Sequence, residues 1–352
     1  MHPIAEILLS WYAENKRELP WRTHPSPYST WLSEIMLQQT RVDQGTGYFI
    51  RFSEKFPSVM ALANASEEEV LKLWQGLGYY SRARNLHAAA KQVVAQYGGR
   101  FPEKAEQLRQ LKGVGPYTAA AIASIAFNEP VPVVDGNVHR VMSRLFDIDL
   151  PVNRPEGHRS VEQAMAELLP SNRAGDFNQA VMEFGALHCT PKRYDCSRCV
   201  LRDHCRSHAN QTSEDRPVKS AKTAVKAVWF DYLVTERNGA VLMRQRGATG
   251  IWARLNDFPS VEWTHDASST ELTKALVESG VQNPRLTQLG DPMTHLLSHR
   301  KITARFFGLD ADFVPDGWMD ARWVARDEIH ALPIPRLIDR FLEGGGMDGY
   351  LG

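Results

Sequence analysis

All four cysteines of the chain lie between residues 189 and 205, and this placement restricts the fold more than any other feature of the sequence. Cys189, Cys196, Cys199 and Cys205 have the spacing Cys-x6-Cys-x2-Cys-x5-Cys. A disulfide framework would spread its cysteines to connect distant segments. Four neighbouring thiolates can instead converge on one metal centre, and the spacing alone does not separate zinc from an iron–sulfur cluster. The segment therefore predicts a metal-ordered loop.

The part of the chain before this loop has the pattern of a compact domain of short helices. Apolar residues within 67–77 recur at the spacing of one helix face, and residues 118–127 are small and apolar almost all round, which predicts a buried helix. Prolines and glycines interrupt the helical segments at short intervals. We expect one α domain over residues 1–206.

The composition changes after Cys205. The residues that follow are polar and without periodicity, and they predict an exposed linker over 207–224. Residues 227–246 contain two β-rich runs on either side of Asn238-Gly239, which is a hairpin signal. Further strands are expected at 302–309 and 321–324, and helices at 269–279 and 336–342. A second domain over 225–352 is therefore expected to be α+β.

The charge balance limits the kinds of partner that the chain can have. Lysine and arginine together number 41, as do aspartate and glutamate, so the formal net charge is zero. This balance excludes a polycation that binds nucleic acid with its whole surface, although it allows a local basic face. No apolar run approaches the ~18 residues of a membrane span, and no secretory signal is visible. We therefore expect a cytoplasmic protein with no membrane partner and, since no interface is obvious, a monomer.

Residues 111–120 have the form of a helix–hairpin–helix, with Gly113, Val114 and Gly115 at the turn. Two glycines let the backbone turn tightly and approach a ligand, and the helix that follows directs its N-terminus at an anion. Such a hairpin binds a DNA phosphate without reading the base sequence. An ordinary glycine turn between two helices would contain the same three residues.

Two acidic residues stand out by their surroundings. Glu34 lies among apolar neighbours in a helical pattern, where an unpaired carboxylate is costly and its pKa tends to rise. Asp135 precedes Gly136 in the segment Val-Val-Asp-Gly-Asn-Val. Taken singly, each acid could equally be a surface residue, a turn residue or a helix cap.

Taken together, several segments resemble the adenine DNA glycosylases, the MutY family of the helix–hairpin–helix superfamily. They are Leu-Pro-Trp-Arg (19–22), Ser-Glu-Ile-Met-Leu-Gln-Gln-Thr (33–40), Gly-Leu-Gly-Tyr-Tyr-Ser-Arg-Ala-Arg-Asn-Leu (76–86), the hairpin, Asp-Gly-Asn-Val (135–138) and the four cysteines. The resemblance implies a mainly α N-terminal helix–hairpin–helix glycosylase domain with an iron–sulfur loop, plus an α+β Nudix-like C-terminal domain. It also implies one [4Fe–4S] cluster held by the four cysteines.

The resemblance also implies a reaction. Adenine is a poor leaving group until a ring nitrogen is protonated, so the family role of Glu34 is to donate that proton and afterwards to act as base toward water. Asp135 then stabilises the oxocarbenium-like sugar. Endonuclease III-like enzymes carry a lysine nucleophile where this chain has Tyr117, so we expect a monofunctional glycosylase. His139 likewise replaces a lysine that some relatives have.

Other site residues follow from the same resemblance. Tyr117, Asn137 and Gln179 match positions that line the adenine pocket, and Gln39 and Tyr79 match residues that wedge into the base stack. Ser298 and His299 match a C-terminal loop that recognises the base opposite adenine, although Leu297 stands where an aromatic residue is common. The expected partner is double-stranded DNA with adenine opposite 8-oxoguanine or guanine, so we expect a bacterial-type protein at the nucleoid.

Two other functions remain to be weighed. A glycosylase of the same superfamily could remove an oxidised or mismatched pyrimidine, but Tyr117 in place of lysine argues against an oxidised-pyrimidine lyase, and the Nudix-like domain favours a mismatched purine. A non-catalytic DNA-binding iron–sulfur protein could scan DNA, but it would not need both Glu34 and Asp135. The C-terminal domain is not expected to hydrolyse diphosphates, since Glu278 is the acid that remains of the Nudix catalytic box in the matching residues 273–280.

Overall fold

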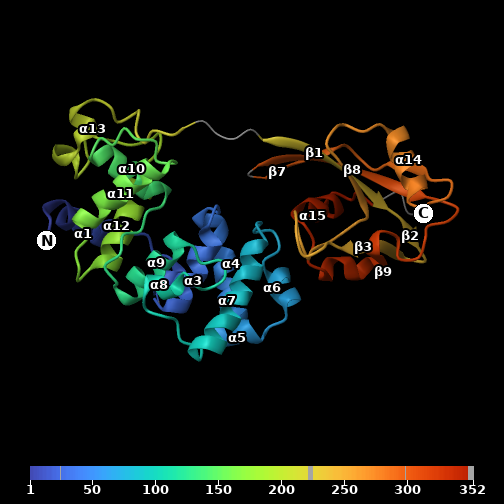
Figure 1. Cartoon of the computed structure of the whole chain (residues 1–352), viewed down its shortest axis with the longest axis horizontal. Helices are drawn as coiled ribbons and strands as arrows, with labels where there is room; N and C mark the ends of the chain where they lie inside the picture. Colours follow the sequence, from blue (N-terminus) through green and yellow to red (C-terminus); the bar gives the residue numbers. More distant parts are fainter. Residues whose placement is uncertain (24, 221–224, 298, 348–352) are drawn as a thin grey trace. The chain divides into compact units, whose positions relative to one another are not determined.

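The computed structural model describes residues 1–23, 25–220, 225–297 and 299–347 (Figure 1). Ser298, one of the residues predicted to recognise the opposite base, lies outside the described residues. The chain divides into two compact units. Residues 1–65 and 84–221 form the first unit, and residues 66–83 and 222–352 form the second.

The first unit is built of helices joined by short turns. Proline occupies the first turn of several of them, where its fixed φ suits the helix and its missing N–H is not needed. The helices of this unit are α1 (Pro3–Asn15), α2 (Pro20–Thr23), α3 (Pro27–Leu37), α4 (Val42–Lys55), α5 (Val59–Asn64), α7 (Ser81–Tyr97, which begins in the second unit), α8 (Ala105–Leu108), α9 (Pro116–Phe127), α10 (Gly136–Leu145), α11 (Pro155–Leu168), α12 (Ala174–Leu187), η1 (Arg202–His204) and α13 (Arg206–Ala209).

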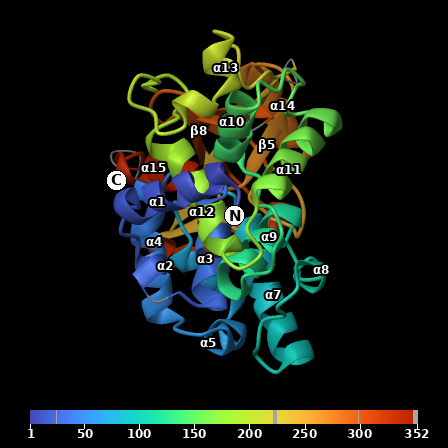
Figure 2. The ribbon, with the colours of Figure 1, turned by 90° about the vertical axis from the view of Figure 1, so that its left-hand side faces the viewer.

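Helix α12 is the centre of the first unit. It packs against α1, α9 and α10 (Figure 2). Its side chains Phe177, Val181 and Phe184 are buried in one core with Leu8 of α1 and Met142 of α10. Burial of each such side chain contributes ~1.5–3 kcal/mol. The predicted buried helix at 118–127 is confirmed as most of α9, and these packed helices form the frame that carries the candidate site.

Residues 207–220, which the sequence predicts to belong to a linker, make polar contacts with the first unit. Ser207 is fully buried, and its hydroxyl donates to the carbonyl oxygen of Arg144 at 2.5 Å. The carboxylate of Asp147 accepts hydrogen bonds from Asn210 at 2.8 Å and from Thr212 at 2.7 Å. These polar contacts attach the segment to the first unit without apolar periodicity, which is why its sequence resembles that of a linker.

The second unit contains two sheets. The larger has the strand order β5-β1-β8-β6, with β7 also paired to β8, and the smaller has the order β2-β3-β4, with β9 also paired to β3. The elements of this unit are α6 (Glu67–Leu73), β1 (Lys226–Val234), β2 (Glu236–Arg237), β3 (Ala240–Gln245), β4 (Asn256–Asp257), β5 (Ser260–Trp263), α14 (Ser269–Glu278), β6 (Arg285–Gln288), β7 (Met293–Leu296), β8 (Arg300–Asp310), η2 (Trp318–Asp320), β9 (Ala321–Ala325), η3 (Arg326–Ala331) and α15 (Arg336–Glu343). The predicted strands and helices of this α+β domain are confirmed.

The larger sheet buries both of its faces. Strands β1 and β8 are parallel, and their side chains alternate between the faces. Tyr232 and Phe306 pack with Phe341 of α15 on one face, whereas Leu233 packs with Leu276 of α14 on the other. The two helices therefore cover opposite faces of the sheet.

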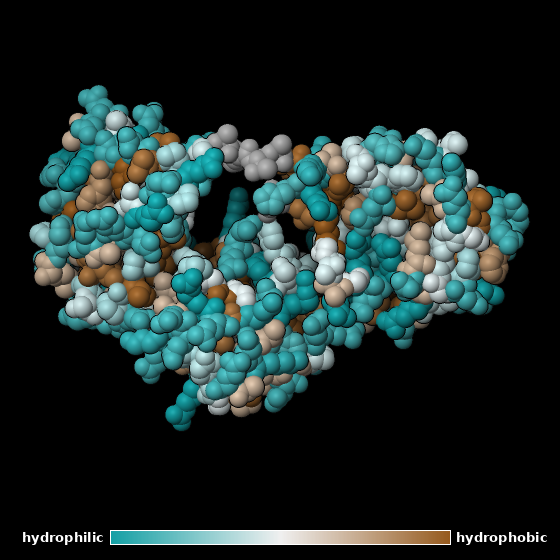
Figure 3. Space-filling model, viewed as in Figure 1, coloured by the Kyte–Doolittle hydropathy of each residue, from teal (hydrophilic) through white to brown (hydrophobic). Residues whose placement is uncertain are grey.

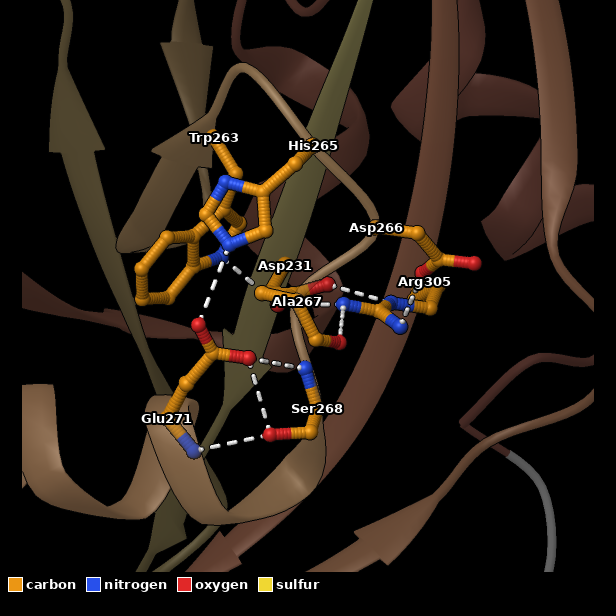
Figure 4. A network of polar contacts seen from close by, with 8 residues as sticks. All are labelled: Asp231, Trp263, His265, Asp266, Ala267, Ser268, Glu271 and Arg305. Atoms are coloured by element: carbon orange, nitrogen blue, oxygen red, sulfur yellow. Dashed lines mark hydrogen bonds and ion pairs between the residues drawn. The ribbon is translucent and has the colours of Figure 1, made fainter.

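A polar network ties α14 to this sheet (Figure 4). Asp231 of β1 is fully buried and accepts hydrogen bonds from Arg305 of β8 at 2.6 and 2.9 Å. The indole N–H of Trp263 donates to the same carboxylate at 2.8 Å. Arg305 also donates to the carbonyl oxygen of Ala267, which precedes the N-cap residue of α14. The buried charge of Asp231 is therefore paired with the opposite charge of Arg305.

Residues 66–83 group with the second unit, which differs from the continuous first domain that the sequence predicts. The hydroxyl of Tyr80 donates to the carbonyl oxygen of Ile334 at 3.2 Å. The amide of Gln75 donates to Asp339 at 3.3 Å. These contacts join segments far apart in the sequence, which local patterning does not reveal. None of the described helices is both long and apolar enough to cross a lipid bilayer.

Candidate functional site

A cavity of about 360 Å³ in the first unit contains most of the predicted catalytic and pocket residues. Its volume falls within the ~300–1,000 Å³ range of small-molecule sites. The end of α3, the starts of α9 and α10, helix α12 and the segment around α2 contribute its walls. The lining residues are Arg17, Leu19, Trp21, Arg22, Glu34, Leu37, Gln38, Gln39, Thr40, Val42, Tyr117, Asp135, Asn137, Met182, Glu183 and Ala186.

Glu34 lies on α3 and points its carboxyl group at Tyr117 on α9. The hydroxyl of Tyr117 donates to Glu34 Oε2 at 2.7 Å. Burial raises the pKa of Glu34 to about 7, the hydrogen bond from Tyr117 opposes the rise, and the negative charge of Asp135 adds to it. Burial also raises the pKa of Tyr117 well above its usual value, so this hydroxyl remains a donor. The site can therefore hold a protonated carboxylic acid near neutral pH.

Asp135 is the N-cap residue of α10. Its carboxylate accepts from the backbone N–H of Val138 at 2.7 Å and from the side-chain amide of Asn137 at 2.8 Å. Burial raises the pKa of Asp135, whereas these hydrogen bonds and the charge of Arg140 oppose the rise. Because the helix N-terminus and these donors favour the ionised form of Asp135, we assign the negative charge of the Glu34–Asp135 pair to it.

Of the remaining predicted pocket residues, some line the cavity and one does not. Asn137 and Gln39 line the cavity, and Gln39 has a positive φ of 57°. Gln179 is not among the lining residues, and its amide oxygen accepts a hydrogen bond from the Tyr12 hydroxyl at 3.2 Å. This hydrogen bond is typical of a glutamine with a structural role.

Sequence reasoning missed three charged residues in the cavity wall. Arg17 and Arg22 both donate to the carboxylate of Glu183, which is 1% exposed. Arg22 is the last residue of the Leu-Pro-Trp-Arg segment, and Glu183 lies one helical turn after Gln179. That spacing was a usable signal, because residues four apart share one face of a helix.

The hairpin has the geometry of a backbone anion site. Gly113 has a φ of +75°, and a side chain there would place its Cβ 2.6 Å from the Cβ of Asn85. Gly115 caps α9 without a side-chain hydrogen bond to the first turn. Val114 is buried beneath the turn, whereas both glycines are exposed. The exposed backbone of Gly113 and Gly115 can therefore approach a phosphate.

The predicted recognition residues outside the cavity lie in the second unit. Tyr79 is 41% exposed and has a positive φ of 49°. His299 is exposed beside the turn between β7 and β8, and its carbonyl oxygen accepts from the N–H of Lys226 at 3.0 Å. Leu297 packs against the core of this unit. Glu278, the remaining Nudix-box acid, forms a surface pair with Lys274.

The four cysteines form no disulfide and are half-buried, and Cys189, Cys199 and Cys205 pack against the core around α12. Burial raises the pKa of the Cys199 thiol to about 11, and the other three cysteines lie close enough to raise it further. Arg144 Nη1 donates to Cys189 Sγ at 3.4 Å. Among the described residues, no group of three or more His, Cys, Asp or Glu side chains is arranged so that it could hold a metal ion. The donor set, four neighbouring thiols, is of the class that iron–sulfur clusters require.

Comparison with known proteins shows which families the chain matches. Residues 32–171 match the HhH-GPD superfamily base excision DNA repair protein family, and residues 232–344 match the NUDIX domain. The chain is 35% identical to the adenine DNA glycosylase of Homo sapiens, over 93% of this chain and 71% of that protein. It is 32% identical to the adenine DNA glycosylase of Buchnera aphidicola subsp. Schizaphis graminum, over 97% of this chain and 99% of that protein.

A solved thermostable thymine-DNA glycosylase is similar at 28% identity with a TM-score of 0.54, over 59% of this chain and 95% of that one. The adenine DNA glycosylases thus match nearly the whole chain, whereas this structure matches only part of it. The matches confirm the fold class that the sequence predicts. The chain belongs to the adenine DNA glycosylase family.

Proposed function

We propose that this chain hydrolyses the N-glycosidic bond of adenine opposite 8-oxoguanine or guanine in double-stranded DNA, as a monofunctional glycosylase of base excision repair. The observation that supports this proposal most is the pair of carboxyl groups in the cavity. Glu34 has its pKa raised to about 7, and Asp135 accepts hydrogen bonds from Val138 and Asn137. Two acids in different surroundings supply one proton donor and one anion.

The reaction uses the two groups in turn. The target adenine leaves the duplex and enters the cavity, at a cost of a few kcal/mol for unstacking. Protonated Glu34 gives its proton to a ring nitrogen of adenine, and the bond between the base and the sugar breaks with its electron pair going to the base. The Asp135 carboxylate stabilises the positive sugar, and ionised Glu34 then takes a proton from the water that attacks it.

The absence of an amine at position 117 supports the monofunctional assignment. A lyase needs an amine that forms a Schiff base with the sugar. Tyr117 has no amine, and its hydroxyl donates a hydrogen bond to Glu34. His139 contacts His158, with 2.9 Å between ring nitrogens, and burial lowers the pKa of His139 to about 4. Neither residue supplies a Schiff-base nucleophile.

The other parts of the chain have supporting roles in this proposal. The four cysteines would hold one [4Fe–4S] cluster, which orders the loop and takes no part in the acid–base steps. The hairpin would hold a DNA phosphate, Gln39 and Tyr79 would wedge into the base stack, and the loop at Ser298 and His299 would check the opposite base. Figure 3 shows hydrophilic side chains over most of the face toward the viewer, with apolar groups between them. We further propose that the chain is a monomer and a cytoplasmic protein that associates with the nucleoid through DNA.

Single-turnover cleavage of three duplexes tests the proposal. Adenine is placed opposite 8-oxoguanine, guanine or thymine, and strand breaks are scored with and without alkali, because an abasic site breaks only after treatment. We expect alkali-dependent breaks at adenine in the first two duplexes alone. Alkali-independent breaks would contradict the monofunctional assignment, and absence of adenine release from every duplex that is bound would contradict the proposal.

A further inference from the structure

Glu183 is a buried carboxylate in the cavity wall for which the proposed reaction has no use. Glu183 Oε1 accepts from the backbone N–H of Arg17 at 2.9 Å and from its Nε at 2.8 Å. Glu183 Oε2 accepts from Arg17 Nη2 at 2.8 Å and from Arg22 Nη2 at 3.0 Å. Burial would raise the pKa of Glu183, but these hydrogen bonds outweigh it and hold the pKa at about 2. The group is therefore ionised throughout the working pH range.

The two arginines are fixed to each other as well as to Glu183. Arg22 Nη1 donates to the carbonyl oxygen of Arg17 at 3.1 Å, and the Arg22 guanidinium lies over the Tyr12 ring at 5.6 Å. One carboxylate thus holds two cations against the cavity wall. Arg22 is the one whose charge reaches Glu34, where it lowers the pKa of that carboxyl group.

The charged and titratable groups around the two carboxyl groups lie on several elements. Those that act on Glu183 and its arginines are Arg17 after α1, Arg22 of α2, and Tyr12 of α1. Those that act on Glu34 are Tyr117 of α9, Asp135 at the start of α10, and Arg22 of α2. Arg22 belongs to both sets, so it links the two carboxyl groups.

We propose that Glu183 is a positioning residue that holds Arg17 and Arg22 on the cavity wall and so keeps the catalytic proton on Glu34. This inference rests on the proposed function, since it concerns the proton that Glu34 donates. Without Glu183, Arg22 loses the buried carboxylate to which its Nη2 donates. The Glu34 carboxylate, across the same cavity, then becomes its partner, and an opposite charge at short range favours ionisation.

The pH dependence of single-turnover adenine excision tests this role, because a purely structural loss would change the rate and not its pH dependence. Excision needs protonated Glu34, so the rate of the unaltered chain falls as the pH rises through about 7. In Glu183→Gln we expect this fall to move down by about 1 pH unit or more. In Arg22→Gln we expect it to move up, and in the double variant to return toward its original position.

Asp176→Asn is the matched control, because Asp176 is an exposed carboxylate of the same helix that pairs with Arg173 at 2.9 Å. We expect its pH profile to equal that of the unaltered chain. A Glu183→Gln variant that loses rate equally at every pH, or whose profile moves up, would overturn the proposal. If Glu183→Gln does not fold, Arg22→Gln decides, and an unmoved profile in that variant would overturn the link between Arg22 and Glu34.

A second readout separates this inference from the proposed function. The carbonyl stretch of the protonated Glu34 side chain is followed by infrared difference spectroscopy, with Glu34→Gln as the blank. It titrates whether or not the chain excises adenine. We expect the titration in Glu183→Gln to move down by the same ~1 pH unit. An unmoved titration would overturn the positioning role, while failure of excision with a moved titration would count against the proposed function alone.

Discussion

Buried carboxyl groups occur in both units, and the two units surround them differently. In the second unit, Asp231 receives two hydrogen bonds from Arg305 and one from Trp263. In the first unit, Glu34 receives one from the neutral Tyr117. An arginine so close stabilises the carboxylate in its ionised form, whereas burial beside a neutral phenol leaves the carboxyl group of Glu34 able to keep a proton.

The difference shows what the surroundings of an acid reveal about its role. Asp231 joins neighbouring strands and supports the start of α14, so its charge is used for structure. Glu183 shows the same pattern inside the cavity wall, where it binds Arg17 and Arg22. Glu34 lies in the same cavity without a guanidinium within hydrogen-bond distance in the described residues, and we assign it the proton transfer.

Replacement of Glu34 gives the largest expected effect. Glu34→Gln keeps the side-chain shape but cannot give up a proton, so we expect single-turnover excision to fall by ~10²–10⁴ while duplex binding is retained. The surface variant Glu156→Gln, whose carboxylate pairs with Arg159, is the control and should keep the full rate. Normal excision by Glu34→Gln would show that the proton comes from another group.

Replacement of a buried carboxylate by an amide in the second unit should lower the stability of that unit. Asp231→Asn removes the fully buried carboxylate that binds Arg305 and leaves the exposed Asp266 as its ion-pair partner, so we expect a loss of ~1–3 kcal/mol in the unfolding free energy of this unit. Chemical denaturation measures the loss. Glu278→Gln, which removes an exposed pair with Lys274, should change stability by less than ~1 kcal/mol. Equal losses in the two variants would remove the distinction between buried and exposed pairs.

Asp135→Asn removes the negative charge of the Asp135 side chain but keeps its ability to cap α10. Asparagine caps a helix as well as aspartate does, so α10 should remain intact. The lost negative charge should lower excision by ~10²–10³, as removal of one transition-state stabiliser does. Thermal melting and single-turnover rates measured on the same sample check both halves of this prediction. A large loss of stability would mean that capping, not charge, is the main role of Asp135.

The smallest expected effect is on stability and depends on pH. Glu34 binds its proton more tightly when folded, so between the ordinary carboxyl pKa and about 7 the folded state holds more protons than the unfolded state. Stability therefore falls as the pH rises through this range. Glu34→Gln removes the fall and should be more stable than the unaltered chain at pH 8, by on the order of 1–3 kcal/mol. The two should be equal at pH 4, and a less stable variant at pH 8 would contradict the raised pKa.

Local patterning predicted the elements better than their assembly. The apolar run at 118–127 and the Asn238-Gly239 turn are local signals, and both became the expected helix and hairpin. Residues 207–220 were predicted to be a linker because a segment held by hydrogen bonds to Asp147 has no periodicity. The grouping of residues 66–83 with the second unit depends on contacts such as Tyr80 with Ile334.

In the candidate site, too, residues with a local signal could be predicted, and residues joined by long-range contacts could not. Glu34 could be selected from its apolar neighbours, whereas Tyr117 was predicted from the family resemblance. Glu183 and Arg17 are separated by more than 160 residues, so no spacing rule joins them. Gln179 was predicted from the resemblance, but its bond to Tyr12 is visible only in the folded chain.

Infrared titration of the unaltered chain shows directly whether Glu34 carries a proton near neutral pH. Spectra recorded from pH 5 to pH 9 are compared with those of Glu34→Gln, so that the difference isolates the carboxylic acid at position 34. We expect a protonated carbonyl band that disappears with a midpoint of about pH 7. A band that is already absent at pH 5 would show that Glu34 is ionised like an ordinary carboxylate and is not the proton donor.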